Sequence, residues 1–273
     1  MFSHKCGSAV SFQENVQVAK IDGCILLKLF RWQPSLETLL PFAAGLVVIG
    51  LSFAMMAVKE IAWLGIVIRD IFQVFLVGIV FPLAYIRLSG NEFADFGLNL
   101  KNWYIFLPIN LMLGAVLFLV FLLESPLPAD FKIIAAVLWK AAYVMCALFF
   151  ELLFFYGFLR TLFERSFGVV SAVVLTALFY AFHHIGFQPE YGKLIFVGLM
   201  YTIVYRLGKS ALLIFPFFLG VGGVYDALIQ SEVVAPILFP KTRALYLSFL
   251  ILVTLAWTWK EVKSVHAQCD QGS

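Results

Sequence analysis

The sequence contains little charge. Only 13% of its 273 residues are Asp, Glu, Lys or Arg, whereas 63% are hydrophobic. Soluble domains are about 25% charged and about half apolar, and a soluble fold of this length cannot hide so much apolar surface in one core. The scarcity of charge therefore excludes an ordinary soluble domain, and it predicts membrane lipid as a partner.

The sequence also lacks the clusters that mark several other classes of protein. No block of Lys and Arg forms an electrostatic footprint for nucleic acid, so we expect no nucleic-acid partner. The four cysteines are scattered without CxxC spacing, which argues against a disulfide framework or a zinc cage. No HExxH pattern occurs and nothing in the sequence resembles a zinc site, so we expect no cofactor, although this absence does not by itself exclude a metal ion.

Long apolar runs, separated by short polar breaks, make up most of the chain. A helix needs about 20 apolar residues to cross a bilayer. Runs without strict alternation exclude a membrane barrel, so the predicted fold is all-α, a polytopic membrane protein with about eight transmembrane helices. The expected spans are Leu39–Val58, Ile61–Ile86, Trp103–Leu123, Ile133–Leu162, Val169–Ile185, Leu194–Leu207, Ala211–Ile229 and Ala244–Trp259.

The distribution of Lys and Arg predicts the orientation. We expect a polar N-terminal arm at 1–37, a transmembrane domain at 38–260 and a C-terminal tail at 261–273. The arm, the tail and the even-numbered loops together contain twelve Lys and Arg, against five in the odd-numbered loops. Because cytoplasmic loops are enriched in positive charge, both termini are expected in the cytoplasm. The expected location is a plasma membrane of the bacterial type.

We consider seven of the ionisable side chains within the predicted spans. Charge at membrane depth is costly, so each of them is a hypothesis for function. Arg69 and Asp70 are adjacent, and we interpret them as structural. Lys140 lies early in its span and can extend to the surface. The remaining four are Glu151, His183, His184 and Asp226.

Three of these residues are expected at one depth. The turn between the fourth and fifth spans centres near Phe167, with Glu151 sixteen residues before it and His183 sixteen after it. In an antiparallel helix pair, both then lie roughly 24 Å along the helix from the turn. Asp226 lies sixteen residues beyond Ser210 and reaches the same level. A buried carboxylate near a histidine suits a general base, although a polar cluster that only joins helices is the alternative.

The region around Glu151 resembles the first motif of the CPBP family of intramembrane proteases, which includes the CAAX prenyl endopeptidases. That motif is Glu-Glu-x-x-x-Arg, usually followed by Gly. When the two are aligned on Gly157, Glu151 takes the place of the first Glu. Leu152 replaces the second Glu, and Tyr156 replaces the Arg.

Two later segments are similar to the second and third motifs of the same family. The second motif, Phe-x-x-x-His, is matched by Phe179 and His183. The third, His-x-x-x-Asn or Asp, is matched at its end by Asp226, with Gly222 in the place of its His. The resemblance covers about 91–228, the expected protease-like core.

The resemblance implies a glutamic-type intramembrane endopeptidase acting on a membrane-anchored peptide or protein. Glu151 would be the general base, His183 the assisting group and Asp226 a third contact for the oxyanion. His184 is a candidate to replace the missing histidine, although adjacent residues of a helix point about 100° apart. The further supporting positions are Tyr156, Phe179 and Gly222.

Two other functions remain open from the sequence. A catalytically degenerate relative could act as a membrane binding or scaffold protein, and the replaced motif residues favour this reading. A transporter or ion pathway would also place charges within the membrane, but its usual broken helices and repeated halves are not found in the sequence.

Overall fold

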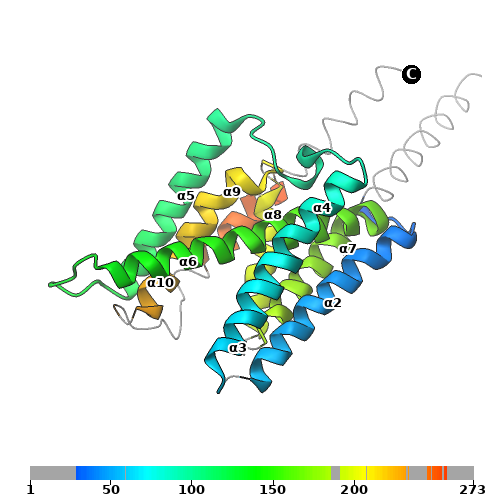
Figure 1. Cartoon of the computed structure of the whole chain (residues 1–273). Helices are drawn as coiled ribbons and strands as arrows, with labels where there is room; N and C mark the ends of the chain where they lie inside the picture. The colour runs from blue at the N-terminus through cyan, green and yellow to red at the C-terminus, as the bar shows by residue number, and fades with distance from the viewer. Residues whose placement is uncertain are drawn as a thin grey trace, which may run out of the picture.

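The computed structural model describes residues 29–58, 60–185, 191–206, 208–231, 233, 245, 246, 248–253, 255 and 256. These residues form helices and connecting turns, with no strand among them (Figure 1). The predicted all-α class is therefore confirmed for this part of the chain. Most of the predicted N-terminal arm, six of the sixteen residues of the eighth predicted span and the whole C-terminal tail lie outside the described residues.

The helices follow one another with short connections. The first of them are α2 (Leu36–Ala57), then a continuous run of α3 (Ala62–Ile66), η1 (Val67–Val80) and α4 (Phe81–Leu88). The others are η2 (Phe93–Phe96), α5 (Trp103–Glu124), α6 (Ala135–Glu151), η3 (Leu152–Leu159), α7 (Arg160–His183), α8 (Tyr191–Tyr205), α9 (Ala211–Phe218), η4 (Leu219–Gly223) and α10 (Val224–Gln230). The segments η1, η3 and η4 have the wider turns of a π-helix.

Four helical runs are long and apolar enough to cross a membrane. They are Leu36–Ala57, Ala62–Leu88, Trp103–Glu124 and Ala135–His183. The first three coincide with the first three predicted spans. The last joins the fourth and fifth predicted spans, and α8 is a shorter apolar helix. The protein therefore has the helices of a membrane protein, while the count of eight spans stays a prediction.

The fourth run differs from the others in burial. Within their most apolar windows, the first three runs are 28%, 11% and 22% buried, whereas Ala135–His183 is 61% buried. Large apolar side chains on the outer runs are exposed, among them Leu46, Phe75 and Leu119. Exposed apolar surface of this extent suits contact with lipid. The helices that contain Glu151 and His183 thus form the centre of the molecule.

Gly168 reverses the chain between these two central segments. Its φ of 80° and ψ of 176° are not helical, although helical residues lie on both sides. A side chain at this position would also lie 2.7 Å from the carbonyl oxygen of Leu29. Glycine has no Cβ, so it can adopt this conformation and accept this close approach. The turn that the sequence predicts near Phe167 is present.

Aromatic pairs join the two segments on either side of this turn. Phe163 stacks on Phe179, with ring centroids 5.7 Å apart, and Tyr156 contacts Tyr180 at 5.9 Å. Phe163 and Phe179 are each closer in sequence to Gly168 than Tyr156 and Tyr180 are, so the second pair encloses the first. This nested order is that of an antiparallel pair, so the point where α6 continues into η3 lies beside the far end of α7.

A second close contact joins α5 to the helix formed by α9, η4 and α10. A Cβ at Gly220 would lie 2.2 Å from the carbonyl oxygen of Gly114, which requires the two backbones to touch. Figure 1 shows α5 and α9 side by side, with α6 passing across them. Because α10 continues from this packed helix, the contact fixes Asp226 relative to the centre of the molecule.

Candidate functional site

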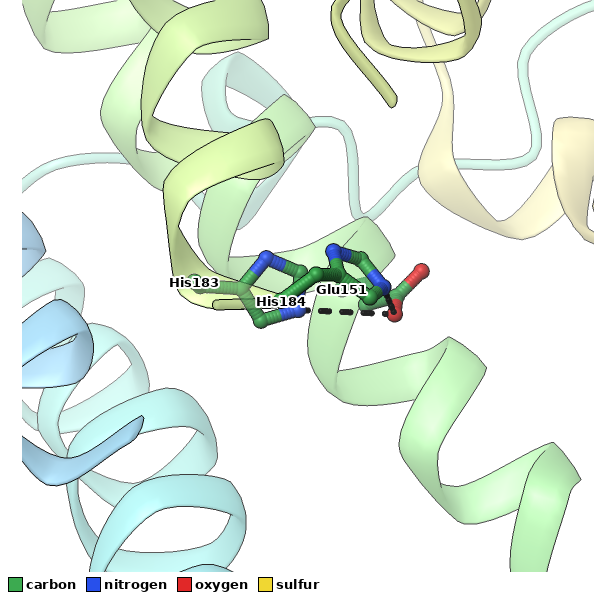
Figure 2. A group of neighbouring side chains, drawn as sticks. All are labelled: Glu151, His183 and His184. Carbon is green, nitrogen blue, oxygen red and sulfur yellow. Dashed lines mark ion pairs between the residues drawn. The ribbon is translucent and has the colours of Figure 1, made fainter. Parts of the chain in front are cut away.

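Glu151 and His183 meet beside each other, Glu151 where α6 continues into η3 and His183 where α7 ends. Glu151 is the last residue of α6 and His183 the last residue of α7. The Oε1 atom of Glu151 lies 3.6 Å from Nε2 of His183 (Figure 2). Glu151 lies 17 residues before Gly168 and His183 lies 15 residues after it, and this similar spacing from the turn brings both residues to about one level.

His184 points to the same carboxylate as His183. Its Nε2 atom is also 3.6 Å from Oε1 of Glu151, and the two imidazole centroids are 3.8 Å apart. The angular argument against His184 is wrong because the helix ends at His183. His184 has a φ of −81° and a ψ of 0°, so it leaves the helical path and its ring turns back beside its neighbour.

One backbone carbonyl contacts both histidines. Nδ1 of His183 lies 2.5 Å from the oxygen of Tyr180, and Nδ1 of His184 lies 2.9 Å from the same oxygen. A carbonyl oxygen only accepts hydrogen bonds, so both Nδ1 atoms donate. This contact sets the direction of both rings, and it leaves both Nε2 atoms facing Glu151.

A cavity of about 160 Å³ opens beside this group. Its lining includes Glu151, His183 and His184, and its other polar residues are Arg69, Gln73, Tyr143 and Asp226. Asp226, in the first turn of α10, therefore lines the same cavity as Glu151 and His183. At about 30 Å³ per molecule of liquid, this volume is enough for several waters.

Three of the supporting positions lie away from the cavity. Tyr156 is fully buried, and its ring packs against Tyr201 and Phe218. Phe179 packs against Phe163 on the side of α2. Gly222 is not among the lining residues, although a Cβ there would come within 3.2 Å of the Asp226 carboxylate.

A hydrogen-bonded chain that the sequence analysis missed holds the end of α7. Nε2 of Gln73 donates to Oγ of Ser52 at 2.9 Å, and this hydroxyl donates to the carbonyl oxygen of His183 at 2.5 Å. Both side chains are buried. The signal available in the sequence was an amide and a hydroxyl within apolar spans, and neither group is ionisable.

Arg69 and Asp70 form an ion pair on the wall of the cavity. Nε of Arg69 lies 2.6 Å from Oδ1 of Asp70, to which the hydroxyl of Tyr143 also donates at 3.3 Å. The Arg69 guanidinium lies 5.0 Å from the centroid of the Tyr143 ring. These contacts link η1 to α6, in keeping with the structural role that we inferred, and they engage the positive charge of Arg69.

The group has two chemical abilities. A carboxylate beside a cavity that can hold water can accept a proton from a water molecule, with the histidine Nε2 atoms as further acceptors. A carboxylate and two imidazoles are also common metal ligands, and the three ligating atoms here lie within 4.8 Å of one another. No family model, curated protein or solved structure matches the chain.

Proposed function

We propose that this protein is an intramembrane endopeptidase, similar to the CPBP family, that hydrolyses a peptide bond of a membrane-anchored peptide or protein. The observation that carries the proposal is the convergence of Glu151, His183 and His184 on one cavity between long apolar helices. We also propose that the protein lies in a plasma membrane of the bacterial type, that it crosses the membrane eight times, and that both termini are in the cytoplasm.

Glu151 is the base in this mechanism. Its carboxylate takes a proton from a water, whose oxygen attacks the carbonyl carbon of the scissile bond. His183 assists by accepting the second hydrogen of the water at Nε2, which directs the attacking lone pair. When the tetrahedral intermediate collapses, the carbon–nitrogen bond breaks and the proton passes from Glu151 to the leaving amine. Asp226 can donate to the oxyanion only in its protonated form.

The cost of placing a carboxylate in this position supports a functional role. The Glu151 side chain is only 12% exposed, and it lies among apolar helices. Ionisable groups at such depth are rare in membrane proteins and mark proton, ion or substrate sites. The cavity beside the carboxylate is large enough for several waters, and it supplies the space that hydrolysis requires.

The experiment compares membranes that contain the wild type with membranes that contain Glu151→Gln. Mass spectrometry of new peptide ends should find cleavage products of membrane-anchored proteins only with the wild type, with a loss of at least about 100-fold in the variant. Glu92→Gln, at an exposed position outside the cavity, is the matched control and should cleave normally. Equal products from wild type and Glu151→Gln would refute the proposal.

A membrane binding or scaffold protein is the second candidate. Leu152 and Tyr156, which replace charged residues of the first motif, are 1% and 0% exposed and pack in the apolar core. This replacement favours a cavity that binds without cleaving. This function predicts that the mass-spectrometric comparison finds no new peptide ends. It also predicts that a membrane protein co-purifies intact with the wild type and with Glu92→Gln alike.

A further inference from the structure

The segment just before α2 is hydrogen-bonded to the turn between the two central segments. The N–H group of Arg31 donates to the carbonyl oxygen of Phe167 at 3.0 Å, and that of Gln33 donates to the oxygen of Ser166 at 2.9 Å. The hydroxyls of Ser166 and Thr38 also share a buried hydrogen bond of 2.8 Å. These contacts involve the main chain or buried groups, so the backbone from 31 to 33 has a fixed place on the turn.

Large apolar side chains of this segment are exposed although its backbone is fixed. Phe30, Trp32 and Leu36 are 54%, 80% and 87% exposed. Trp32 lies four residues before the first residue of α2, which is long and apolar enough to cross a membrane. Tryptophan is enriched where the hydrocarbon of a bilayer meets its headgroups. The segment therefore suits the membrane interface, with apolar surface available to lipid chains.

The side-chain partner of Arg31 does not cancel its positive charge. Nε of Arg31 donates to Oε1 of Gln33 at 2.6 Å, and Nη2 donates to the same oxygen. Because this acceptor is a neutral amide, it orients the guanidinium without contributing a negative charge. Both side chains are exposed. The contact uses two of the five N–H groups of a guanidinium, so an anion outside the protein can accept from others.

The face around this segment contains more cations than carboxylates. Among the described residues, the segment, the even-numbered loops and the adjoining helix ends contain seven cations, Arg31, Arg87, Lys101, Arg160, Arg165, Arg206 and Lys209, and four carboxylates, Glu37, Glu92, Asp95 and Glu164. Ion pairs of 3.5 Å and 3.3 Å join these loops to the turn at 164–168. The excess of positive charge attracts anions to this face.

We propose that Arg31 and Trp32 form a binding site for an anionic phospholipid, with its phosphate on Arg31 and an acyl chain beside Trp32 and Leu36. Phosphate oxygens accept hydrogen bonds, and a guanidinium presents paired N–H groups to them. A phospholipid joins a phosphate to an apolar chain, which matches a cation and an exposed indole that are adjacent in sequence. The positive excess of the face favours a lipid with net negative charge over a zwitterionic one.

This site is separate from the proposed cleavage site. It lies at the turn around Gly168, whereas Glu151 is 17 residues before that glycine. The lipid site therefore does not depend on whether the protein cleaves a peptide. Because the segment contacts the turn of the two central segments, a lipid bound to Arg31 strengthens the attachment of α2 to the centre of the molecule.

The test counts bound lipid by mass spectrometry. The protein is purified in a neutral detergent and equilibrated with equal amounts of phosphatidylglycerol and phosphatidylcholine, and the lipids bound per chain are measured. We expect the wild type to prefer phosphatidylglycerol. Arg31→Gln should lower the affinity for this lipid by about fivefold, and Arg31→Lys, which retains the charge, should lower it less. Gel filtration and circular dichroism verify that each variant is folded.

Lys132→Gln is the matched control, because it removes one exposed cation from an odd-numbered loop and should bind as the wild type does. Trp32→Ala should weaken binding by about threefold or more, since it removes apolar contact with the chain. Equal binding of both lipids by the wild type, or affinity for phosphatidylglycerol unchanged in Arg31→Gln or in Trp32→Ala, would overturn the site. Displacement of the lipid by an equal concentration of inorganic phosphate would show a site for free phosphate and would overturn the lipid assignment.

Discussion

At the scale of single residues, a main-chain oxygen holds both histidines of the cavity. The oxygen of Tyr180 orients two imidazoles, and the oxygen of His183 receives the hydroxyl of Ser52. Buried polar groups in a helix bundle are costly unless each has a partner. The end of α7 therefore depends on a few hydrogen bonds that cross between helices.

Ser52 provides a test of that dependence. Replacing it with alanine leaves the Gln73 amide and the His183 carbonyl without this partner, so Ser52→Ala should lower the free energy of unfolding by about 1 kcal/mol. Unfolding in mixed micelles, followed by circular dichroism, measures the change. Ser89→Ala, at an exposed helix end, should stay within about 0.5 kcal/mol of the wild type. Equal losses in both variants would contradict the assigned role.

The ionisable residues are the part of the site that could be predicted from the sequence. Glu151 and His183 follow from their equal distance to one turn, because helical rise converts residue count into depth. The direction of His184 could not be predicted, since it depends on where α7 ends. Gln73 is uncharged, and a buried amide becomes informative only when its partner on another helix is known.

At the scale of helices, packing depends on how closely two backbones approach. Gly114 and Gly220 allow α5 to touch the helix of α9, η4 and α10. Small residues at such crossings are common in membrane proteins, because lipid provides no hydrophobic force between helices and close van der Waals contact replaces it. Asp226 lies one and a half turns beyond this contact, so the crossing helps to set its position.

A larger side chain at this crossing should separate the two helices. Gly220→Val places a Cβ where the oxygen of Gly114 lies 2.2 Å away, and should cost about 1–3 kcal/mol or more. The matched control is Gly50→Val in α2, where a Cβ meets nothing within 4 Å; its cost should be under about 1 kcal/mol. Thermal unfolding in detergent distinguishes the two. Similar midpoints would show that the crossing contributes little.

Helix positions were easier to predict than helix breaks. The bounds of the first three spans agree within a few residues, because apolar run length dictates them. The fourth and fifth spans appear as one helical run interrupted only at Gly168, where the backbone leaves helical geometry for a single residue. Run length cannot reveal how abrupt such a turn is, since that depends on the segment around Leu29 packed against it.

At the scale of the whole molecule, ion pairs join the even-numbered loops of the predicted topology to one another. Arg165 lies 3.5 Å from Asp95, which joins the loop after the second span to the turn between the fourth and fifth. Arg206 lies 3.3 Å from Glu164 and joins the next even loop to the same turn. The even-numbered loops of the predicted topology thus share a face of the molecule.

Cysteine labelling tests which side of the membrane this face occupies. In a cysteine-free background, Glu92→Cys lies in an even loop and Asp130→Cys in an odd loop, and both positions are exposed. Because positive loops stay in the cytoplasm, a membrane-impermeant maleimide should label Asp130→Cys in intact cells and Glu92→Cys only after lysis. Labelling of Glu92→Cys in intact cells would reverse the proposed orientation.

The carbonyl of Tyr180 has a consequence for mutation. An orienting group that belongs to the main chain is present whatever amino acid occupies its position, so no single substitution at 180 deletes it. Random mutation can remove Glu151 or either imidazole in one step, but it can misdirect the imidazoles only by shifting the end of α7. The orientation of the two imidazoles therefore depends on the backbone of α7, and it is less sensitive to single substitutions than the imidazoles themselves are.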